Sequence, residues 1–202
     1  QGRNADMTEF RISDSTYSQN PWFAAYNYIN SMEKERLIGA MNATWDLTDF
    51  LYVRGRFGGD RYNAIKTNST PYGTAYQPRG SMNETSTTFK QFDADFFLGT
   101  NSQQLVDGLS ATAFVGVGTN KQKYEAYGVS GSDFIVAGLI NVKNTKNQGS
   151  SYSFWEKQIN SAYGSAELAW NDYAFLTVTA RNDWFSTLSL KDKKAPNHDL
   201  YT

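Results

Sequence analysis

The sequence contains no cysteine, few prolines and no long apolar run, and each absence excludes a class of protein. With Cys 0 among 202 residues, neither a disulfide framework nor a thiolate metal site is possible. No apolar run approaches the roughly 20 residues that a membrane-spanning helix needs, so a helical membrane protein is excluded. The formal net charge of -1 argues against a nucleic-acid surface, which is built on excess basic charge.

Histidine is nearly absent as well, because the only one is His198, in a polar tail. We interpret it as a solvated loop residue, so a His-dependent catalytic triad or a histidine metal site is unsupported. Asp93 and Asp95 are expected on one face of a strand, about 7 Å apart, and glycosidases also use a carboxylate pair. Two solvated carboxylates facing Arg54 or Arg56 explain the pair more simply. The sequence thus predicts no catalytic residue, metal ligand or cofactor, and indicates a protein that is not an enzyme.

Aromatic residues are plentiful, with 13 Tyr, 13 Phe and 5 Trp against 4 Pro, which favours strands. The clearest pattern is a hairpin around the turn Asn171-Asp172, in which small or apolar residues alternate with polar ones. The first face carries Ala162, Gly164, Ala166, Leu168, Trp170, Ala174, Leu176, Val178 and Ala180, and the second carries Ser161, Ser165, Glu167, Thr177, Thr179, Arg181 and Asp183. A hairpin that is apolar outside and polar inside is typical of a membrane β-barrel.

The same alternation predicts further strands, at 35–47, 50–62, 87–99 and 109–120. In the second of these, Arg54 and Arg56 share a face, which is costly in a dry core but not in a wet lumen. The connections alternate in length: they are short at 48–49, 101–104 and 171–172, and long at 63–84 and 121–152. Outer-membrane barrels have this asymmetry. We therefore predict an all-β fold: an antiparallel transmembrane β-barrel section of about six strands, with short periplasmic turns and long extracellular loops.

Candidate residues for a substrate path come from the predicted lumen face and from the long loops. The lumen candidates are Arg54, Arg56, Asp60 and Arg181, and the loop candidates are Tyr72, Tyr76 and Tyr127. The alternative for the charged residues is a lumen lined with ion pairs and contacts to a plug. Tryptophans near strand ends, such as Trp45 and Trp170, are expected to anchor at the lipid interface instead. Residues 1–19 are too sparse in apolar positions to predict a strand.

Several segments carry a family resemblance. They read NPW at 20–22, ERLIG at 35–39, WDLTDFL at 45–51, RGRFGGD at 54–60, KQINSAYGSAEL at 157–168 and TARNDWFSTL at 179–188. In this order and spacing, from about residue 20 to 188, the chain resembles the SusC/RagA family of TonB-dependent outer-membrane transporters. The resemblance implies a large barrel in the bacterial outer membrane, whose lumen is closed by an N-terminal plug, as in the 22-stranded transporters.

The resemblance also implies a function and partners. Members of the family import oligosaccharides, glycans or peptides in Bacteroidetes-type bacteria, with a SusD-like lipoprotein as an extracellular lid and with energy delivered through TonB. Residues 1–202 are then expected to be one part of the β-barrel domain of such a receptor, in contact with outer-membrane lipid. Neither a plug domain nor a TonB box is recognisable in this sequence, so contact with TonB is expected through the plug of a longer parent protein.

Two other classes fit the same strands and aromatic residues. One is a structural or adhesive surface protein that uses a β-scaffold to display long loops. The other is a soluble carbohydrate-binding β-sandwich. Water-soluble behaviour without detergent distinguishes the sandwich from the barrel. The sequence contains no motif that distinguishes a glycan substrate from a peptide.

Overall fold

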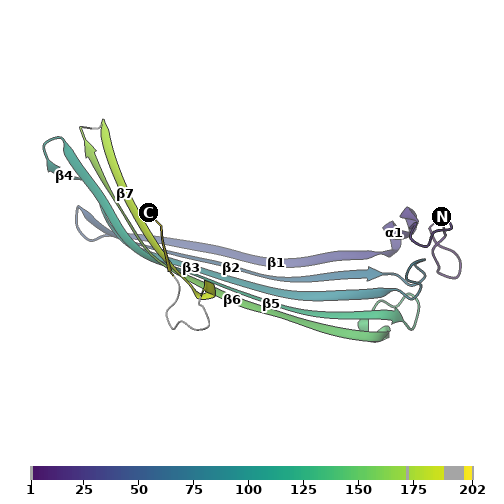
Figure 1. Cartoon of the computed structure of the whole chain (residues 1–202). Coiled ribbons are helices and arrows are strands. Elements are labelled where there is room, and N and C mark those ends of the chain that lie inside the picture. Colours follow the sequence, from purple (N-terminus) through teal and green to yellow (C-terminus); the bar gives the residue numbers. More distant parts are fainter. Residues whose placement is uncertain (1, 172, 189–197, 202) are drawn as a thin grey trace. The chain divides into compact units, whose positions relative to one another are not determined.

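The computed structural model describes residues 2–171, 173–188 and 198–201, which form one open antiparallel sheet (Figure 1). The strands are β1 (Ile29–Asp46), β2 (Leu51–Thr70), β3 (Ser81–Thr100), β4 (Gln103–Val106), β5 (Leu109–Phe134), β6 (Thr145–Trp170), β7 (Ala174–Phe185) and β8 (His198–Tyr201). The helical elements are α1 (Pro21–Asn27), η1 (Val142–Asn144) and η2 (Ser186–Leu188). Neighbours follow the order β1-β2-β3-β5-β6-β7-β8, and β4 pairs with β5.

The predicted all-β class and the alternation of connections are confirmed, but the strands extend further than predicted. β2 continues to Thr70 and β5 to Phe134, so the loops that the sequence predicted at 63–84 and 121–152 shrink to 71–80 and 135–144. The physical reason is that these extensions carry polar residues on both faces. The apolar alternation that marks a half-buried strand therefore disappears while the backbone pairing continues.

Two of the predicted connections also differ in detail. The predicted turn at 101–104 contains the start of β4, and the chain reverses instead around Gly108, whose φ is 76°. The predicted tail contains a short strand, β8, in which His198 pairs with Trp184 of β7 through the backbone. The residues 189–197, Thr202 and the turn residue Asp172 lie outside the described part of the chain.

The chain divides into two units, which we describe separately. The loop unit comprises Gln1–Arg36, Tyr62–Thr88 and Tyr124–Phe154, and it contains α1 and the two longer connections. The turn unit comprises Leu37–Arg61, Phe89–Lys123 and Trp155–Thr202, and it contains the short turns. Strands β1, β2, β3, β5 and β6 each contribute residues to both units.

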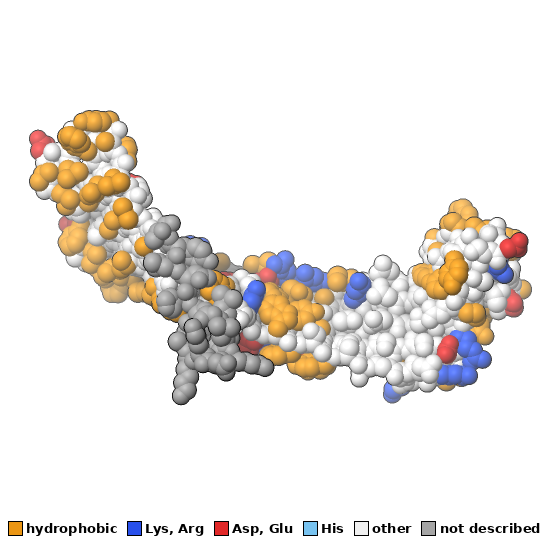
Figure 2. All heavy atoms as spheres, in the orientation of Figure 1, with side chains coloured by type: hydrophobic (Ala, Val, Ile, Leu, Met, Phe, Trp, Pro, Cys, Tyr) orange, Lys and Arg blue, Asp and Glu red, His pale blue; other side chains and the backbone are white. Residues whose placement is uncertain are grey.

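The turn unit presents apolar side chains on one face of the sheet. In the β6–β7 hairpin, Ala166 pairs with Val178 and Leu168 with Leu176, so residues that were predicted to share one face lie opposite one another. On the other face, the Ser165 and Thr179 hydroxyls lie 3.0 Å apart, and Thr177 donates to Glu167 at 3.1 Å. The apolar side chains are exposed: Leu37 is 75% exposed, Leu176 61% and Val117 57%. Figure 2 shows hydrophobic side chains gathered at the end of this unit that holds β4 and the β6–β7 turn.

The loop unit owes its order to a small set of buried groups around α1. Asn20 caps the helix, because its side-chain oxygen accepts from Trp22 N at 3.0 Å. The buried Glu9 carboxylate accepts from the backbone N–H of Asn20 at 2.5 Å and from that of Ala75 at 2.9 Å. Phe23 of α1 is fully buried. The segment 2–19, for which no strand was predicted, is thereby attached to α1 and to the connection at 71–80.

Candidate functional site

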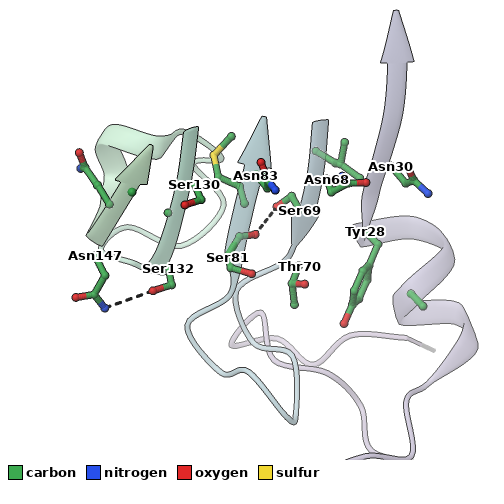
Figure 3. Close-up of a pocket in the computed structure, with 16 residues that line it drawn as sticks. Tyr28, Asn30, Asn68, Ser69, Thr70, Ser81, Asn83, Ser130, Ser132 and Asn147 are labelled. Carbon is green, nitrogen blue, oxygen red and sulfur yellow. Dashed lines mark hydrogen bonds between the residues drawn. The ribbon is translucent and has the colours of Figure 1, made fainter. Parts of the chain in front are cut away.

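A cleft of about 840 Å³ opens on the sheet of the loop unit, and the polar side chains that line it are all uncharged (Figure 3). Adjacent strands each contribute residues to it. The polar residues that line it are Tyr28, Asn30, Asn68, Ser69, Thr70, Ser81, Asn83, Ser130, Ser132, Asn147 and Gln148. Pairs of these residues stand two positions apart on one strand, because alternate residues of a strand project from one face. The pairs are Asn68 and Thr70 on β2, Ser81 and Asn83 on β3, and Ser130 and Ser132 on β5. The result is a grid of amides and hydroxyls across the sheet.

Part of this grid is already paired within the protein. Ser69 donates its hydroxyl to the Ser81 carbonyl at 3.2 Å, and the Asn147 amide donates to the Ser132 hydroxyl at 3.3 Å. Among the residues that the structure describes, the side chains of Asn30 and Asn68 have no hydrogen-bond partner. Each amide offers two donors and an acceptor. The cleft therefore combines fixed polar groups with amides that are available to a ligand.

Tyr28 closes one side of the cleft, at the C-terminal end of α1. Its hydroxyl donates to the Tyr76 hydroxyl at 3.0 Å and also accepts from the Gln19 amide. Burial, followed by the hydrogen bond with Tyr76, raises the pKa of Tyr28 well above the ordinary range for tyrosine. The ring therefore stays neutral, and it gives the cleft an aromatic wall without charge.

A second feature lies in the turn unit, on the polar face of the sheet, where aromatic rings form a row capped by arginines. The Phe97 and Phe114 ring centroids are 6.0 Å apart, and those of Phe114 and Tyr163 are 6.2 Å apart. Arg54 lies over Phe97 at 5.4 Å from the ring centroid, and Arg181 lies over Tyr163 at 5.6 Å. We call these residues the aromatic row. A guanidinium over a ring face is attracted by the ring quadrupole, so the row is held together across neighbouring strands.

Hydrogen bonds fix the arginines at the two ends of the row. Arg54 Nε donates to Thr44 Oγ1 at 3.0 Å, and Arg54 and Arg56 line a polar hollow of about 370 Å³ with Asn42 and Thr44. Arg181 Nε donates to both carboxylate oxygens of Asp183, at 2.9 and 3.0 Å. Both guanidinium groups remain partly exposed to solvent, as predicted for a wet face.

The structure distributes the predicted site residues over several places. Tyr76 reaches the cleft wall through Tyr28, whereas Tyr72 lines a hollow between the connection at 71–80 and the N-terminal segment. Tyr127 lies on β5 and not in a loop: its ring centroid is 4.7 Å from that of Tyr152, and its hydroxyl donates to Glu125 at 2.9 Å. Asp60 lies on β2 and is half-buried.

The carboxylate pair on β3 accepts hydrogen bonds from amides and a phenol. Asp93 accepts from the amides of Gln91, at 2.7 Å, and Asn120. Asp95 accepts from the Tyr163 hydroxyl at 3.2 Å. Each carboxylate is thus engaged by a neutral donor, which is a structural arrangement. No group of acidic or histidine side chains suited to a metal ion occurs among the described residues.

Sequence reasoning missed the cleft as a whole. Its residues fall in 63–84 and 121–152, which were predicted to be loops, and in 28–30. The available signal was the recurrence of Asn, Ser and Thr at every second position, as in Asn68 and Thr70 or Ser81 and Asn83. A period of two without apolar residues is the pattern of a strand with two solvated faces.

No family model and no curated protein matches the chain. The fold is similar to a chain in the structure of the RagAB peptide transporter, with a TM-score of 0.76 and 16% identity over 89% of this chain. It is also similar to chains of the RagAB peptide importer in the 'open-open' state, with a TM-score of 0.77 and 15% identity over 90% of this chain, and in the 'closed-closed' state, with a TM-score of 0.76 and 15% identity over 90%.

This chain covers only 20% or 21% of the length of the solved chains that it matches. At this identity the comparison bears on the fold. No helix among the described residues is long and apolar enough to cross a membrane. The similarity confirms, at the level of the fold, the resemblance to the SusC/RagA transporters, and the chain folds as an open section of an antiparallel β-barrel.

Proposed function

We propose that this chain forms a section of the wall of a TonB-dependent importer in the bacterial outer membrane. The parent protein would take up a polar oligomer, either an oligosaccharide or a peptide, and work with a SusD-like lipoprotein lid. The observation that carries the proposal is the exposed apolar face of the turn unit. Leu37, Leu176 and Val117 are each more than half exposed. A contiguous exposed apolar face marks a site of contact with another protein or with a membrane.

The sheet supports a lipid environment over a protein-covered one. A β-sandwich would cover the apolar face with a second sheet, but the described residues form a single sheet. The face opposite carries the aromatic row with its arginines, which suits a water-filled lumen. The solved neighbours bear the name of a peptide transporter, which supports transport as the activity.

The cleft supports capture of a neutral polar ligand. Its asparagine amides match either the hydroxyls of a sugar or the backbone amides of a peptide, because each side chain both donates and accepts. On β2, Asn68 has the sequence parity of Arg54, and on β3 Asn83 has that of Asp93. Alternate residues of a strand share a face. This parity supports a cleft on the lumen side of the wall.

The proposal is tested in cells that express the native polypeptide containing this chain. The triple variant N30A/N68A/N83A removes cleft amides, and the matched control N63A/N160A/N182A removes amides from the opposite parity. At about 1 kcal/mol for each lost hydrogen bond, the cleft variant is expected to bind its substrate on the order of 100-fold more weakly. Uptake of labelled oligosaccharide and peptide mixtures is measured beside the amount of protein in the outer membrane.

The results separate transport from the rival functions. Energy-dependent uptake of one mixture, lost in the cleft variant and kept in the control, supports the importer and identifies its substrate class. A wild-type protein that stays in the aqueous fraction without detergent overturns the membrane placement. A protein that reaches the outer membrane but imports neither mixture, and instead mediates attachment of cells, supports the structural or adhesive alternative.

A further inference from the structure

Two rows of polar side chains run across the strands of the cleft, at right angles to the chain direction. The first row takes one residue from each of four neighbouring strands: Asn30 on β1, Asn68 on β2, Asn83 on β3 and Ser130 on β5. The second row holds Thr70, Ser81, Ser132 and Asn147, and it is continued by Tyr28, which directly precedes β1. Figure 3 shows the members of each row in line across the ribbons.

Side-chain contacts between β2 and β3 fix the alignment of the asparagines in the first row. Thr67 Oγ1 donates to Glu84 Oε2 at 3.4 Å. In an antiparallel pair the next residue of one strand faces the preceding residue of the other, so Asn68 lies opposite Asn83. Neighbouring strands are about 4.8 Å apart, and the amides of the first row therefore recur at this spacing.

The same alignment continues through β5 to β6. A Cβ on Gly128 would lie 3.7 Å from Thr85 Oγ1, so Ser130 lies opposite the first-row residue of β3. The Asn147 amide donates to the Ser132 hydroxyl at 3.3 Å, which joins the second-row residues of β5 and β6. The rows thus follow one straight register across the sheet.

The dimensions of the rows define the ligand that fits between them. Together they cross the five neighbouring strands β1, β2, β3, β5 and β6. Four intervals between strands give a length of about 19 Å. The two rows stand two residues apart on each strand, which separates them by about 7 Å. A ligand that contacts both rows is therefore long and narrow, and it lies across the strands.

The spacing within the rows favours a glycan over a peptide. An extended peptide repeats every ~3.4 Å, so its amides fall out of step with side chains about 4.8 Å apart. The repeat of a linear chain of pyranose rings is close to the strand spacing, and each ring carries hydroxyls along both of its edges. One ring for each strand therefore places hydroxyls against both rows, and an Asn amide both donates to and accepts from a hydroxyl.

The charges around the cleft favour a neutral ligand. The residues that line it are all uncharged. Asp133 and Lys66 border it with opposite charges, and the Asp133 carboxylate already accepts from the Asn147 amide at 2.9 Å. A charged ligand group that loses its water among neutral amides is costly. At the β1 end, the neutral ring of Tyr28 offers an apolar surface to the C–H groups of a sugar.

We propose that the cleft binds a linear, neutral oligosaccharide that lies across the strands, with about one sugar ring for each strand. This inference rests on the proposed import function, and it names the substrate class and the direction of the ligand in that same cleft. A peptide is the competing class, and the experiment below distinguishes the two.

The first step of the test identifies the class of ligand. The native polypeptide that contains this chain is purified in detergent, and its retention is measured on an array. The array carries neutral gluco-, xylo- and manno-oligosaccharides from disaccharide to hexasaccharide, oligogalacturonides of the same lengths, and peptides with blocked ends. We expect retention on a neutral oligosaccharide that increases with length and becomes constant at about five rings, because five strands carry the rows.

The second step tests the direction of the ligand by titration calorimetry with the retained pentasaccharide and its disaccharide. Each of N30A, N83A and S130A is expected to bind the pentasaccharide about fivefold more weakly, which is the usual effect of one lost hydrogen bond. A disaccharide covers two strands only, so at most one of the end variants N30A and S130A should weaken its binding. The control S31A/S86A removes exposed hydroxyls of the opposite parity on β1 and β3, and it should bind both ligands as the wild type does.

Each outcome either supports or overturns the inference. Retention on a neutral oligosaccharide, with effects of the end variants that depend on ligand length, supports it. Retention on peptides or oligogalacturonides in place of neutral glycans overturns it, and so does retention on no glycan at all. A disaccharide whose binding is weakened equally by N30A and S130A overturns the placement across the strands.

The failure of this inference is distinguishable from failure of the proposed function. Fractionation and energy-dependent uptake are measured for the wild type first. A protein that is absent from the outer membrane contradicts the importer itself. A protein that reaches the outer membrane and imports peptides but no oligosaccharide leaves the importer standing and contradicts only the glycan site.

Discussion

Removing the guanidinium of Arg181 is expected to destabilise the turn unit by leaving a buried carboxylate without its partner. Arg181 Nε donates to Asp183 at 2.9 and 3.0 Å, and its Nη2 donates to Ser161 Oγ at 2.9 Å. Asp183 is only 7% exposed. The substitution R181M keeps the unbranched stem of the side chain and removes every one of these hydrogen bonds.

The magnitude follows from the exposure of the two partners. Breaking a fully buried ion pair costs about 3–5 kcal/mol, whereas an exposed pair contributes about 0–1 kcal/mol. The Arg181 side chain is 49% exposed and that of Asp183 10%, so solvent screens the arginine but not the carboxylate. We therefore expect R181M to lower the free energy of unfolding by about 1–2 kcal/mol.

A double-mutant cycle separates this pair from general packing loss. Urea unfolding of the native polypeptide in micelles is measured for the wild type, R181M, D183N and the double variant. In the R181M background, D183N is expected to restore stability, because it replaces a buried charge that lacks a partner by a neutral amide. The control is E167Q on the same hairpin, whose exposed partner is Thr177, with an expected loss below about 0.5 kcal/mol.

Additive effects of R181M and D183N would contradict this prediction. If D183N destabilises the R181M protein as much as it destabilises the wild type, the two residues are not coupled, and the hydrogen bonds between them carry no net stability. A loss in R181M no larger than that in E167Q leads to the same conclusion.

Two further predictions concern the aromatic row and the outer tyrosines. The substitution G116V is expected to lower the free energy of unfolding by about 1–3 kcal/mol, because a Cβ there would lie 2.8 Å from Phe97 Cβ and 2.9 Å from Tyr163 Cε2. The displaced rings should change the near-ultraviolet circular dichroism spectrum. The control G39V, whose added Cβ would meet nothing within 4 Å, should leave that spectrum unchanged. Desolvation, followed by the hydrogen bond to Glu125, raises the pKa of Tyr152 from 10.0 to about 12. A raised pKa means that the stability from this protonated hydroxyl is present below pH 10.0 and is lost as the pH rises through about 12. Tyrosinate absorbance is measured as a function of pH for the wild type and for E125Q. The titration of Tyr152 should shift to lower pH in E125Q, and identical titration curves for the two proteins would contradict the prediction.

The strands of the turn unit could be predicted from the sequence because one of their faces is apolar and the other is polar. Ala166, Leu168 and Val178 alternate with Ser165 and Thr177, and this alternation fixes the strand, its register and its exposed face at once. The family resemblance lies largely in the same segments, and the fold comparison confirms it. The candidates Arg54 and Arg181 were placed on a polar face for the same reason.

The strands of the loop unit could not be predicted in the same way, because polar residues occur on both of their faces. Asn68 and Ser81 lie in the parts of β2 and β3 where polar residues occur on both faces, so they resembled loop residues. Tyr127 was placed in a loop for this reason, although it lies on β5 and contacts Tyr152. The cleft itself depends on which strands are neighbours, and that information is not contained in the local pattern of a single strand.

Glu9 has a consequence for exchanging loops between proteins that share this fold. Its carboxylate accepts from Asn20 N at the start of α1 and from Ala75 N in the connection at 71–80. The same connection is tied to the end of β5, because Phe134 N donates to the Arg79 carbonyl at 2.9 Å. A chimera that receives 71–80 alone would keep the buried carboxylate, and the backbone N–H at position 75 would reach it only if the new segment has the same local conformation. The segments 2–28, 71–80 and 134–144 are therefore connected by hydrogen bonds, and their local structure is expected to be kept in a chimera only when all three move together.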